Sequence, residues 1–161
     1  MGEYAAPGEA VDGAGIRVAV VVSRFNPDIT GPLLEGTRRA LAVRGVVDDD
    51  VTVAWVPGAF ELPLVAKVLA GSGACDAVVC LGAVIRGDTP HFDYVAGEAA
   101  RGLQEAALST GVPVVFGVLT TDTRQQALDR VGGSEGHKGE EAALTALEMV
   151  ALLRHLPRQR D

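Results

Sequence analysis

The sequence of 161 residues is poor in aromatic side chains and in cysteine, and it lacks long apolar runs. Aromatic residues make up 4% of the chain, so the core has to be built from Val, Leu, Ile and Ala. Cys75 and Cys80 are too few for a disulfide scaffold and too far apart for a CxxC redox pair, which favours a reducing, cytoplasmic setting. No run reaches the roughly 18 apolar residues of a membrane span, and residues 1–15 lack the apolar segment of a secretory signal.

Basic side chains are also in deficit. The chain has 14 Lys and Arg against 21 Asp and Glu, which gives a formal net charge of −7. A nucleic-acid or anionic membrane partner is therefore not expected, because both need a cationic face. The 48% hydrophobic and 22% charged residues are typical of a folded globular protein, and the length fits one domain.

The motifs of several enzyme classes are missing. The glycines of residues 13–15 precede their predicted strand, whereas a dinucleotide fingerprint follows one. The glycine-rich segment before Lys138 departs from a Walker A loop, because His137 and Gly139 flank the Lys. There is no G-x-S-x-G elbow, and the three histidines are too dispersed for metal-ligand spacing. Hydride transfer, ATP-driven phosphoryl transfer, serine hydrolysis and a metal site are therefore disfavoured.

Short apolar runs alternate with amphipathic segments along the chain. The runs predict buried parallel strands, and the segments between them have the periodicity of helices. The expected strands cover residues 17–23, 51–56, 77–85 and 112–119. The expected helices cover residues 29–44, 61–70, 93–109, 122–130, with Asp122 as N-cap, and 140–156. This pattern predicts one α/β domain over residues 16–161, with helices on both faces of the sheet, after a flexible arm of residues 1–15.

The last expected helix is more apolar than one sheet face can bury. Its polar residues Glu141, Thr145, Glu148 and His155 form one narrow stripe, and most other positions are Ala, Leu, Met or Val. The excess apolar surface predicts contact with another subunit. The alternative is a helix buried inside its own domain.

Candidate ligand-binding residues follow the ends of the first two strands, where open α/β sheets bind ligands. Phe25 lies in a polar loop, where it either stacks on a planar ligand or plugs the space under a helix. Residues 57–61 form a turn into a helix N-terminus, with small Gly58 and Ala59 that let the backbone approach a ligand. The helix dipole alone explains Glu61.

The segments after the last two strands carry ionisable side chains. Thr89 and the backbone N–H groups near it suit a phosphate. His91 suits proton transfer, although a lone His is more often structural or merely exposed. Phe116 lies within a strand, where it is either a ligand-binding residue or a residue packed in the core. Arg130 and Lys138 are either solvated cations or phosphate ligands near a loop of four glycines.

These segments together resemble the lumazine synthase family. The matching motifs span residues 23 to about 150, in the family's order and at its spacings. They are Ser23-Arg-Phe-Asn26, Pro57-Gly-Ala-Phe-Glu61, Gly82-Ala-Val-Ile-Arg-Gly87, His91-Phe-Asp-Tyr-Val95, Leu119-Thr-Thr-Asp122, and Lys138-Gly139 with Glu141. The resemblance implies a flavodoxin-like three-layer α/β/α sandwich with a four-stranded parallel sheet, to which the N-terminal arm adds an edge strand in the oligomer.

The resemblance also implies a cofactor-independent transferase reaction, the penultimate step of riboflavin biosynthesis. The enzyme condenses 5-amino-6-(D-ribitylamino)uracil with 3,4-dihydroxy-2-butanone 4-phosphate, and releases 6,7-dimethyl-8-ribityllumazine, phosphate and water. Two alternatives are a non-catalytic flavin- or lumazine-binding module on the same scaffold and a purely structural shell protein. Neither needs His91 or Arg130.

The resemblance assigns roles to individual residues. His91 transfers protons, and the butanone phosphate is bound by Asp88, Thr89 and Arg130. The ribitylaminouracil is bound by Phe25, Ala59, Phe60, Glu61, Ala83, Val84, Ile85 and Phe116. Supporting roles fall to Asn26, Gly58, Lys138 and Glu141.

The resemblance finally implies a homo-oligomer. Its unit is a pentamer with sites between adjacent subunits, and Phe116, Arg130 and Lys138 enter the site from the neighbour. A short loop over residues 130–138 favours a sixty-subunit shell, and riboflavin synthase is a further candidate partner. Two positions depart from the family pattern. The carboxylate of Asp88 is expected to turn away from the phosphate, and His137 stands where Asn is frequent.

Overall fold

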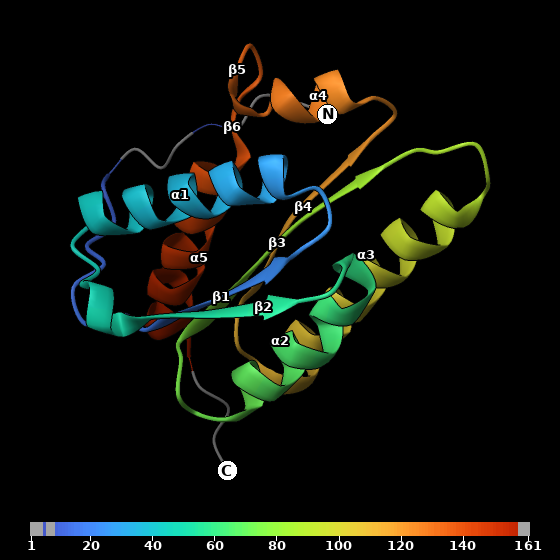
Figure 1. The fold of residues 1–161 in the computed structure, drawn as a ribbon. Coiled ribbons are helices and arrows are strands. Elements are labelled where there is room, and N and C mark those ends of the chain that lie inside the picture. Colours follow the sequence, from blue (N-terminus) through green and yellow to red (C-terminus); the bar gives the residue numbers. More distant parts are fainter. Residues whose placement is uncertain (1–4, 6–8, 158–161) are drawn as a thin grey trace.

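The computed structural model describes residue 5 and residues 9–157, and its centre is a sheet of four parallel strands. The strands are β1 (Val18–Ser23), β2 (Val51–Val56), β3 (Ala77–Ile85) and β4 (Val114–Thr121), in the order β2-β1-β3-β4. Helices cover both faces of this sheet (Figure 1). The predicted three-layer α/β/α sandwich is confirmed, and every predicted strand lies within two residues of the observed one.

The helices and short elements occupy the expected intervals. The helices are α1 (Pro27–Val43), α2 (Leu62–Gly71), α3 (His91–Thr110), α4 (Arg124–Leu128) and α5 (Lys138–His155). Two 3-10 turns, η1 (Asp48–Asp50) and η2 (Ala59–Glu61), flank β2. The loop expected after α4 is instead a small antiparallel hairpin of β5 (Val131–Gly133) and β6 (Gly136–His137).

Strand β1 shows why the sheet is covered on both faces. All six of its residues are buried, and their side chains alternate in direction. The three valines at even positions pack in a core with residues of α1 and α5. Ala19 and Val21 pack in a second core with residues of α2 and α3. A run apolar at every position therefore forms the centre of the sandwich.

The N-cap prediction for the fourth helix is wrong by one residue. Thr123, not Asp122, caps α4, because its hydroxyl accepts a hydrogen bond from the Gln126 N–H at 3.2 Å. The Gln126 side-chain oxygen accepts one in return from the Thr123 N–H at 3.3 Å. This reciprocal capping box satisfies two N–H groups and leaves the carboxylate of Asp122 for another partner.

Helix α5 buries one side and leaves apolar side chains uncovered on another. Its buried residues are Gly139, Ala142, Ala143, Ala146, Leu147 and Val150. Met149, Leu152 and Leu153 are 37%, 48% and 38% exposed. The helix is thus not enclosed by its own domain, and the excess apolar surface expected from the sequence is present on the single chain. Within residues 9–157, no helix is both long and apolar enough to cross a bilayer.

The N-terminal segment is described only in part. Residues 1–4 and 6–8 of the predicted arm lie outside the described residues, as does any edge strand formed by them. Val11 packs against the core, and Gly13 is buried, with its N–H donating to the Arg44 carbonyl at 2.7 Å.

Asp76, just before β3, ties together three segments at the amino end of the sheet. Its carboxylate accepts hydrogen bonds from the backbone N–H of Arg17 at 2.8 Å and from the Arg17 guanidinium at 3.2 Å. Arg154 of α5 lies 3.8 Å from the same carboxylate. Partial burial acts to raise the pKa of Asp76, but these donors outweigh it and hold the pKa below its ordinary value of 3.8.

We expect Asp76→Asn to destabilise the fold by about 1–3 kcal/mol at neutral pH, as for hydrogen bonds to a charged group. Because the folded-state pKa is depressed, this stabilisation is complete above the unfolded-state value and is lost as the pH falls through the folded-state value. Calorimetric unfolding from neutral pH to about pH 3 should show the wild type and the variant converging. Asp48→Asn is the control, since Asp48 is 88% exposed and 3.8 Å from its partner Arg38. A constant gap across this range would contradict the assignment.

Candidate functional site

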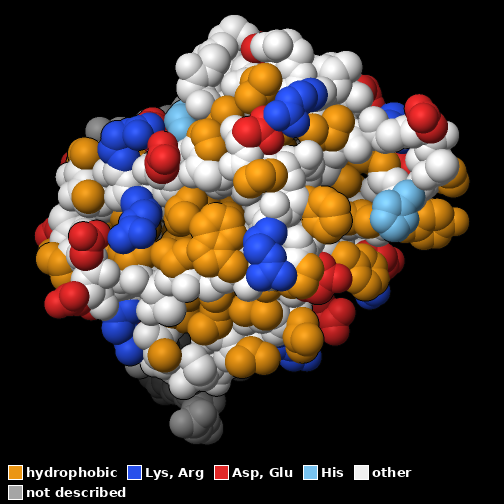
Figure 2. Space-filling model, viewed as in Figure 1, with side chains coloured by type: hydrophobic (Ala, Val, Ile, Leu, Met, Phe, Trp, Pro, Cys, Tyr) orange, Lys and Arg blue, Asp and Glu red, His pale blue; other side chains and the backbone are white. Residues whose placement is uncertain are grey.

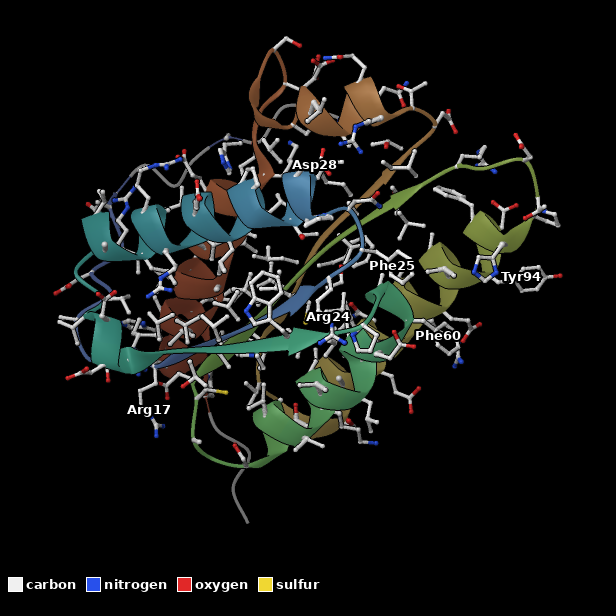
Figure 3. The ribbon with its side chains drawn as sticks, viewed as in Figure 1. Arg17, Arg24, Phe25, Asp28, Phe60 and Tyr94 are labelled. Atoms are coloured by element: carbon white, nitrogen blue, oxygen red, sulfur yellow. The ribbon has the colours of Figure 1, made fainter. Side chains whose placement is uncertain are left out.

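Phe25, directly after β1, is 69% exposed and does not fill the core. Its ring lies over Gly58, where an added Cβ would come within 3.2 Å of a ring carbon. Figure 3 shows Arg24, Phe25 and Phe60 gathered where β1 and β2 end. The alternative of a hydrophobic plug is excluded, and an accessible aromatic face remains for a planar ligand.

The turn that carries Phe25 is fixed from both sides. The Arg24 N–H donates to the Val56 carbonyl at 2.9 Å, which extends the pairing of β1 with β2. Asn26 adopts a left-handed conformation with φ of 56°, and its side-chain amide donates to the Ala83 carbonyl at 3.0 Å. Asn26 therefore ties the β1–α1 turn to β3.

The segment after β2 uses Glu61 to close its own turn. The Glu61 carboxylate accepts a hydrogen bond from the Gly58 N–H at 2.8 Å, as in a capping box. This local role agrees with the simpler explanation of Glu61 as a residue of the helix start. Ala59 is buried, whereas Phe60 is 57% exposed beside it.

The end of β3 leads into the segment with the predicted phosphate and proton-transfer groups. Ala83 is buried, and Val84 and Ile85 are half-buried beside the end of β4. Residues 86–90 are all exposed, so Asp88 and Thr89 face solvent in the single chain. His91 is the first residue of α3 and is also exposed. The last residues of β3 and the residues that follow β1, β2 and β3 thus share the carboxyl edge of the sheet. We call them the strand-end group: Phe25, Gly58, Ala59, Phe60, Glu61, Ala83, Val84, Ile85, Asp88, Thr89 and His91.

Arg86 is a charged residue of this edge to which the sequence assigned no role. Its guanidinium donates to Asp122 at 2.8 Å and to Asp93 at 3.2 Å, and it lies 4.2 Å from the centre of the Phe92 ring. The hydrogen bond to Asp122, with help from Asp93, raises the pKa of Arg86 above its ordinary value. Arg86 is therefore a permanent cation held between two carboxylates. The only sequence signal was an Arg at a strand end, because Asp122 lies 36 residues away.

The other predicted residues line an open groove along β4, between α3 and α5. The groove has a volume of about 1060 Å³. We call its functional side chains the β4-groove group: Phe116, Arg130, Lys138 and Glu141. Phe116 is 45% exposed, so it faces the groove and is not packed in the core. An aromatic ring and two cations thus line one concave surface.

The basic residues of this groove are held by short contacts. The Lys138 ammonium donates to Glu141 at 2.8 Å, and its backbone N–H donates to the Arg130 carbonyl at 2.8 Å. The Arg130 guanidinium donates to the Gln126 carbonyl at 2.8 Å through one nitrogen. Its other guanidinium N–H groups make no hydrogen bond to residues 9–157, and Arg130 lines the groove.

His137 sits at the base of this group as the N-cap of α5. Its Nδ1 accepts a hydrogen bond from the Glu140 N–H at 3.4 Å. Its ring occupies the space beside Gly36 of α1 and closely approaches Gly139, so a side chain at Gly36 would displace it. His137 thus supports the turn that carries Lys138.

One chain does not bring the two groups together. Phe116 pairs with Cys80, whereas Thr121 at the end of β4 pairs with Ile85. Phe116 is therefore five residues, or about 17 Å, short of the edge where the strand-end group lies. Phe25 and residues 58–61 follow β1 and β2, whereas the groove runs along β4 at the other edge of the sheet and reaches only the end of β3.

Comparison with known proteins gives the family. The family model described as 6,7-dimethyl-8-ribityllumazine synthase matches residues 15–154. The chain belongs to this family. Two relatives named 6,7-dimethyl-8-ribityllumazine synthase, from two strains of Thermus thermophilus, are each 58% identical over 144 residues. Each match covers 89% of this chain and 92% of the relative.

Membership of the 6,7-dimethyl-8-ribityllumazine synthase family confirms the resemblance identified from the sequence motifs. It confirms the predicted flavodoxin-like fold and the transferase function in riboflavin biosynthesis. In residues 5 and 9–157, no cluster of three or more His, Cys, Asp or Glu is arranged to hold a metal ion.

Proposed function

We propose that this chain condenses 5-amino-6-(D-ribitylamino)uracil with 3,4-dihydroxy-2-butanone 4-phosphate at a site shared by two neighbouring copies. The strand-end group of one copy supplies the ring-stacking, loop and proton-transfer residues. The β4-groove group of the next copy supplies a second aromatic ring and the cations. The observation that carries this proposal is that the residues after β1 and β2 and the groove along β4 lie toward opposite edges of one sheet.

The apolar surfaces of the chain support a head-to-tail arrangement. Trp55 on edge strand β2 is 48% exposed, and Leu64 and Val68 of α2 are 71% and 63% exposed. Figure 2 shows hydrophobic side chains gathered over β2 and the start of α2. The opposite side carries the uncovered residues of α5, Met149 and Leu153, in the wall of the groove. Two different apolar sides on one chain favour a closed head-to-tail ring. The family resemblance implies that this ring has five subunits.

The short connection between α4 and α5 favours further assembly of pentamers. The hairpin of β5 and β6 closes this connection, with the Glu135 N–H donating to the Asp129 carbonyl at 2.9 Å. No long loop projects there to block stacking of pentamers into a sixty-subunit shell. Sedimentation should separate a pentamer of roughly 80 kDa from a shell of roughly one megadalton.

The reaction needs proton transfers and a bound leaving group. The 5-amino group adds to the ketone, and loss of water gives an imine. Removal of a proton from the adjacent carbon lets the C–O bond to phosphate break, and the ribitylamino nitrogen then closes the ring with loss of a second water. His91 moves these protons, and Thr89 with the loop N–H groups and Arg130 binds the departing phosphate. Holding both substrates in one crevice supplies much of the remaining rate.

The function is tested by mixing the two substrates with the purified oligomer. Lumazine fluorescence should rise together with free phosphate. Binding of a lumazine without product formation would instead support the non-catalytic module, and neither binding nor product would support the structural shell.

We expect His91→Ala to slow product formation by about 10–10³-fold without abolishing it, at or below the usual contribution of a general acid–base group. Stopped-flow absorbance of the product gives the rate. His155→Ala is the control, because His155 ends α5 next to Arg154, which lies 3.8 Å from Asp76 at the amino end of the sheet. A wild-type rate for His91→Ala would remove His91 from the proton-transfer role.

A further inference from the structure

Arg86 joins the end of the sheet to the first turn of α3. Its backbone N–H donates to the Thr121 carbonyl at 2.9 Å, which fixes its main chain to β4. Its guanidinium holds Asp122 after β4 at 2.8 Å and Asp93 of α3 at 3.2 Å, and lies 4.2 Å from the Phe92 ring. One side chain therefore fixes both ends of the four-residue loop 87–90.

Within the described chain, the start of α3 has few other contacts. Val95, one turn after His91, is half-buried against the second core, and the first fully buried residue of the helix is Ala99. Residues 86–91 are all exposed, and residues 87–91 make no side-chain hydrogen bond within the described range. Figure 1 shows the β3–α3 connection projecting beyond the end of the sheet. The position of His91 and of the loop thus depends on the contacts of Arg86.

The same side chain balances charge beside the loop. Asp93 and Asp122 are two carboxylates next to residues proposed to bind a phosphate ester. With Arg86 present the three side chains carry one net negative charge, and without it they carry two. Like charge close to an anion site weakens binding of the anion.

We propose that Arg86 is a positioning residue of the reaction. It aligns His91 and loop 87–90 with the bound substrates and shields the phosphate from Asp93 and Asp122. This inference rests on the proposed function, because it assigns Arg86 to the same site.

The two roles predict different results for two substitutions. Arg86→Ala removes both alignment and charge, so kcat should fall about 10-fold and KM for the butanone phosphate should rise about 10-fold. Arg86→Lys keeps the charge but loses the planar fork and its stacking on Phe92, so KM should return toward wild type while kcat stays low. KM for the ribitylaminouracil should change less than about twofold in both variants. Inhibition by inorganic phosphate should weaken in parallel with KM for the butanone phosphate.

The matched control is Arg101→Ala on the same helix. Arg101 also pairs with two acids, Glu98 at 2.6 Å and Glu105 at 3.8 Å, but it lies three turns from His91. Its rate constants should match the wild type. If Arg101→Ala lowered kcat as much as Arg86→Ala does, the helix would be generally loosened and the inference overturned. The same would follow if Arg86→Ala raised KM equally for the butanone phosphate and for the ribitylaminouracil.

If Arg86→Ala does not form the oligomer, a second variant, Asp93→Asn, tests the same inference. It removes one of the two carboxylates that hold the guanidinium, and we expect kcat to fall severalfold in an intact oligomer. A wild-type kcat in both Asp93→Asn and Arg86→Lys would refute the positioning role and leave the proposed function standing. Absence of product from the wild type itself would instead refute the proposed function.

Discussion

Arg130→Ala is expected to lower kcat/KM for the butanone phosphate about 10²–10⁴-fold, because truncating one partner of an enclosed charge pair costs about 2–5 kcal/mol or more. Arg130 is half-buried in the β4 groove, and its position is fixed by a 2.8 Å hydrogen bond to the Gln126 carbonyl. Its planar fork matches the oxygens of a phosphate. The same contact stabilises the charge on phosphate as it leaves, so kcat should fall as well as KM rise.

Steady-state kinetics with each substrate varied in turn measures this effect. Arg130→Lys should fall between the wild type and Arg130→Ala, since Lys keeps the charge but not the bidentate geometry. Arg38→Ala is the matched control, because Arg38 is an exposed cation of α1 with a distant partner at 3.8 Å. A fully active Arg130→Ala would remove the phosphate assignment.

The expected order of effects separates electrostatics from proton transfer. Arg130→Ala should be more harmful than His91→Ala, because water and substrate groups can replace a proton shuttle in part. An anion left without its cation in a closed site has no such substitute. The reverse order would mean that proton transfer, and not phosphate binding, limits the reaction.

The fold was largely predictable from local sequence patterns. The continuous apolar run before Ser23 has the pattern of a strand buried on both faces, and β1 is buried at every position. The hairpin of β5 and β6 was not predicted, because strands of three and two residues have no period to detect. The N-cap of α4 was misplaced because Asp122 and Thr123 are both good caps. Only the reciprocal partner Gln126 decides between them.

Residues of the candidate site were predictable only where they belong to a recognisable sequence motif. Phe25 had two sequence interpretations, and its exposure decides between them. Arg86 was missed because its partner Asp122 is remote in sequence and adjacent only in the folded sheet. Phe116 cannot join the strand-end group within one chain, since its position midway along β4 is fixed by pairing with Cys80. In the proposed site its role depends on a second copy, which no local pattern specifies.

Mixing two strongly impaired variants should restore activity if the site is shared. The first parent carries Thr89→Ala and His91→Ala in the strand-end group, and the second carries Arg130→Ala in the β4-groove group. In a randomly mixed ring, a site is intact when its strand-end half comes from the second parent and its groove half from the first. About a quarter of the sites meet this condition, so about a quarter of the wild-type activity should return.

The two parents are mixed at equal concentration, unfolded together and refolded. Lumazine fluorescence then measures the activity, and sedimentation checks that the mixed ring has assembled. The recovered sites should have the KM values of the wild type, because each contains two unaltered halves. The matched control mixes Arg130→Ala with Lys138→Ala, both in the groove, where every site keeps one altered half and activity should stay at the average of the two parents. If the first mixture gave only the average of its two parents, the strand-end group and the β4-groove group would have to act within one chain. The roughly 17 Å between Phe116 and the strand ends would then have to be closed by a change in fold.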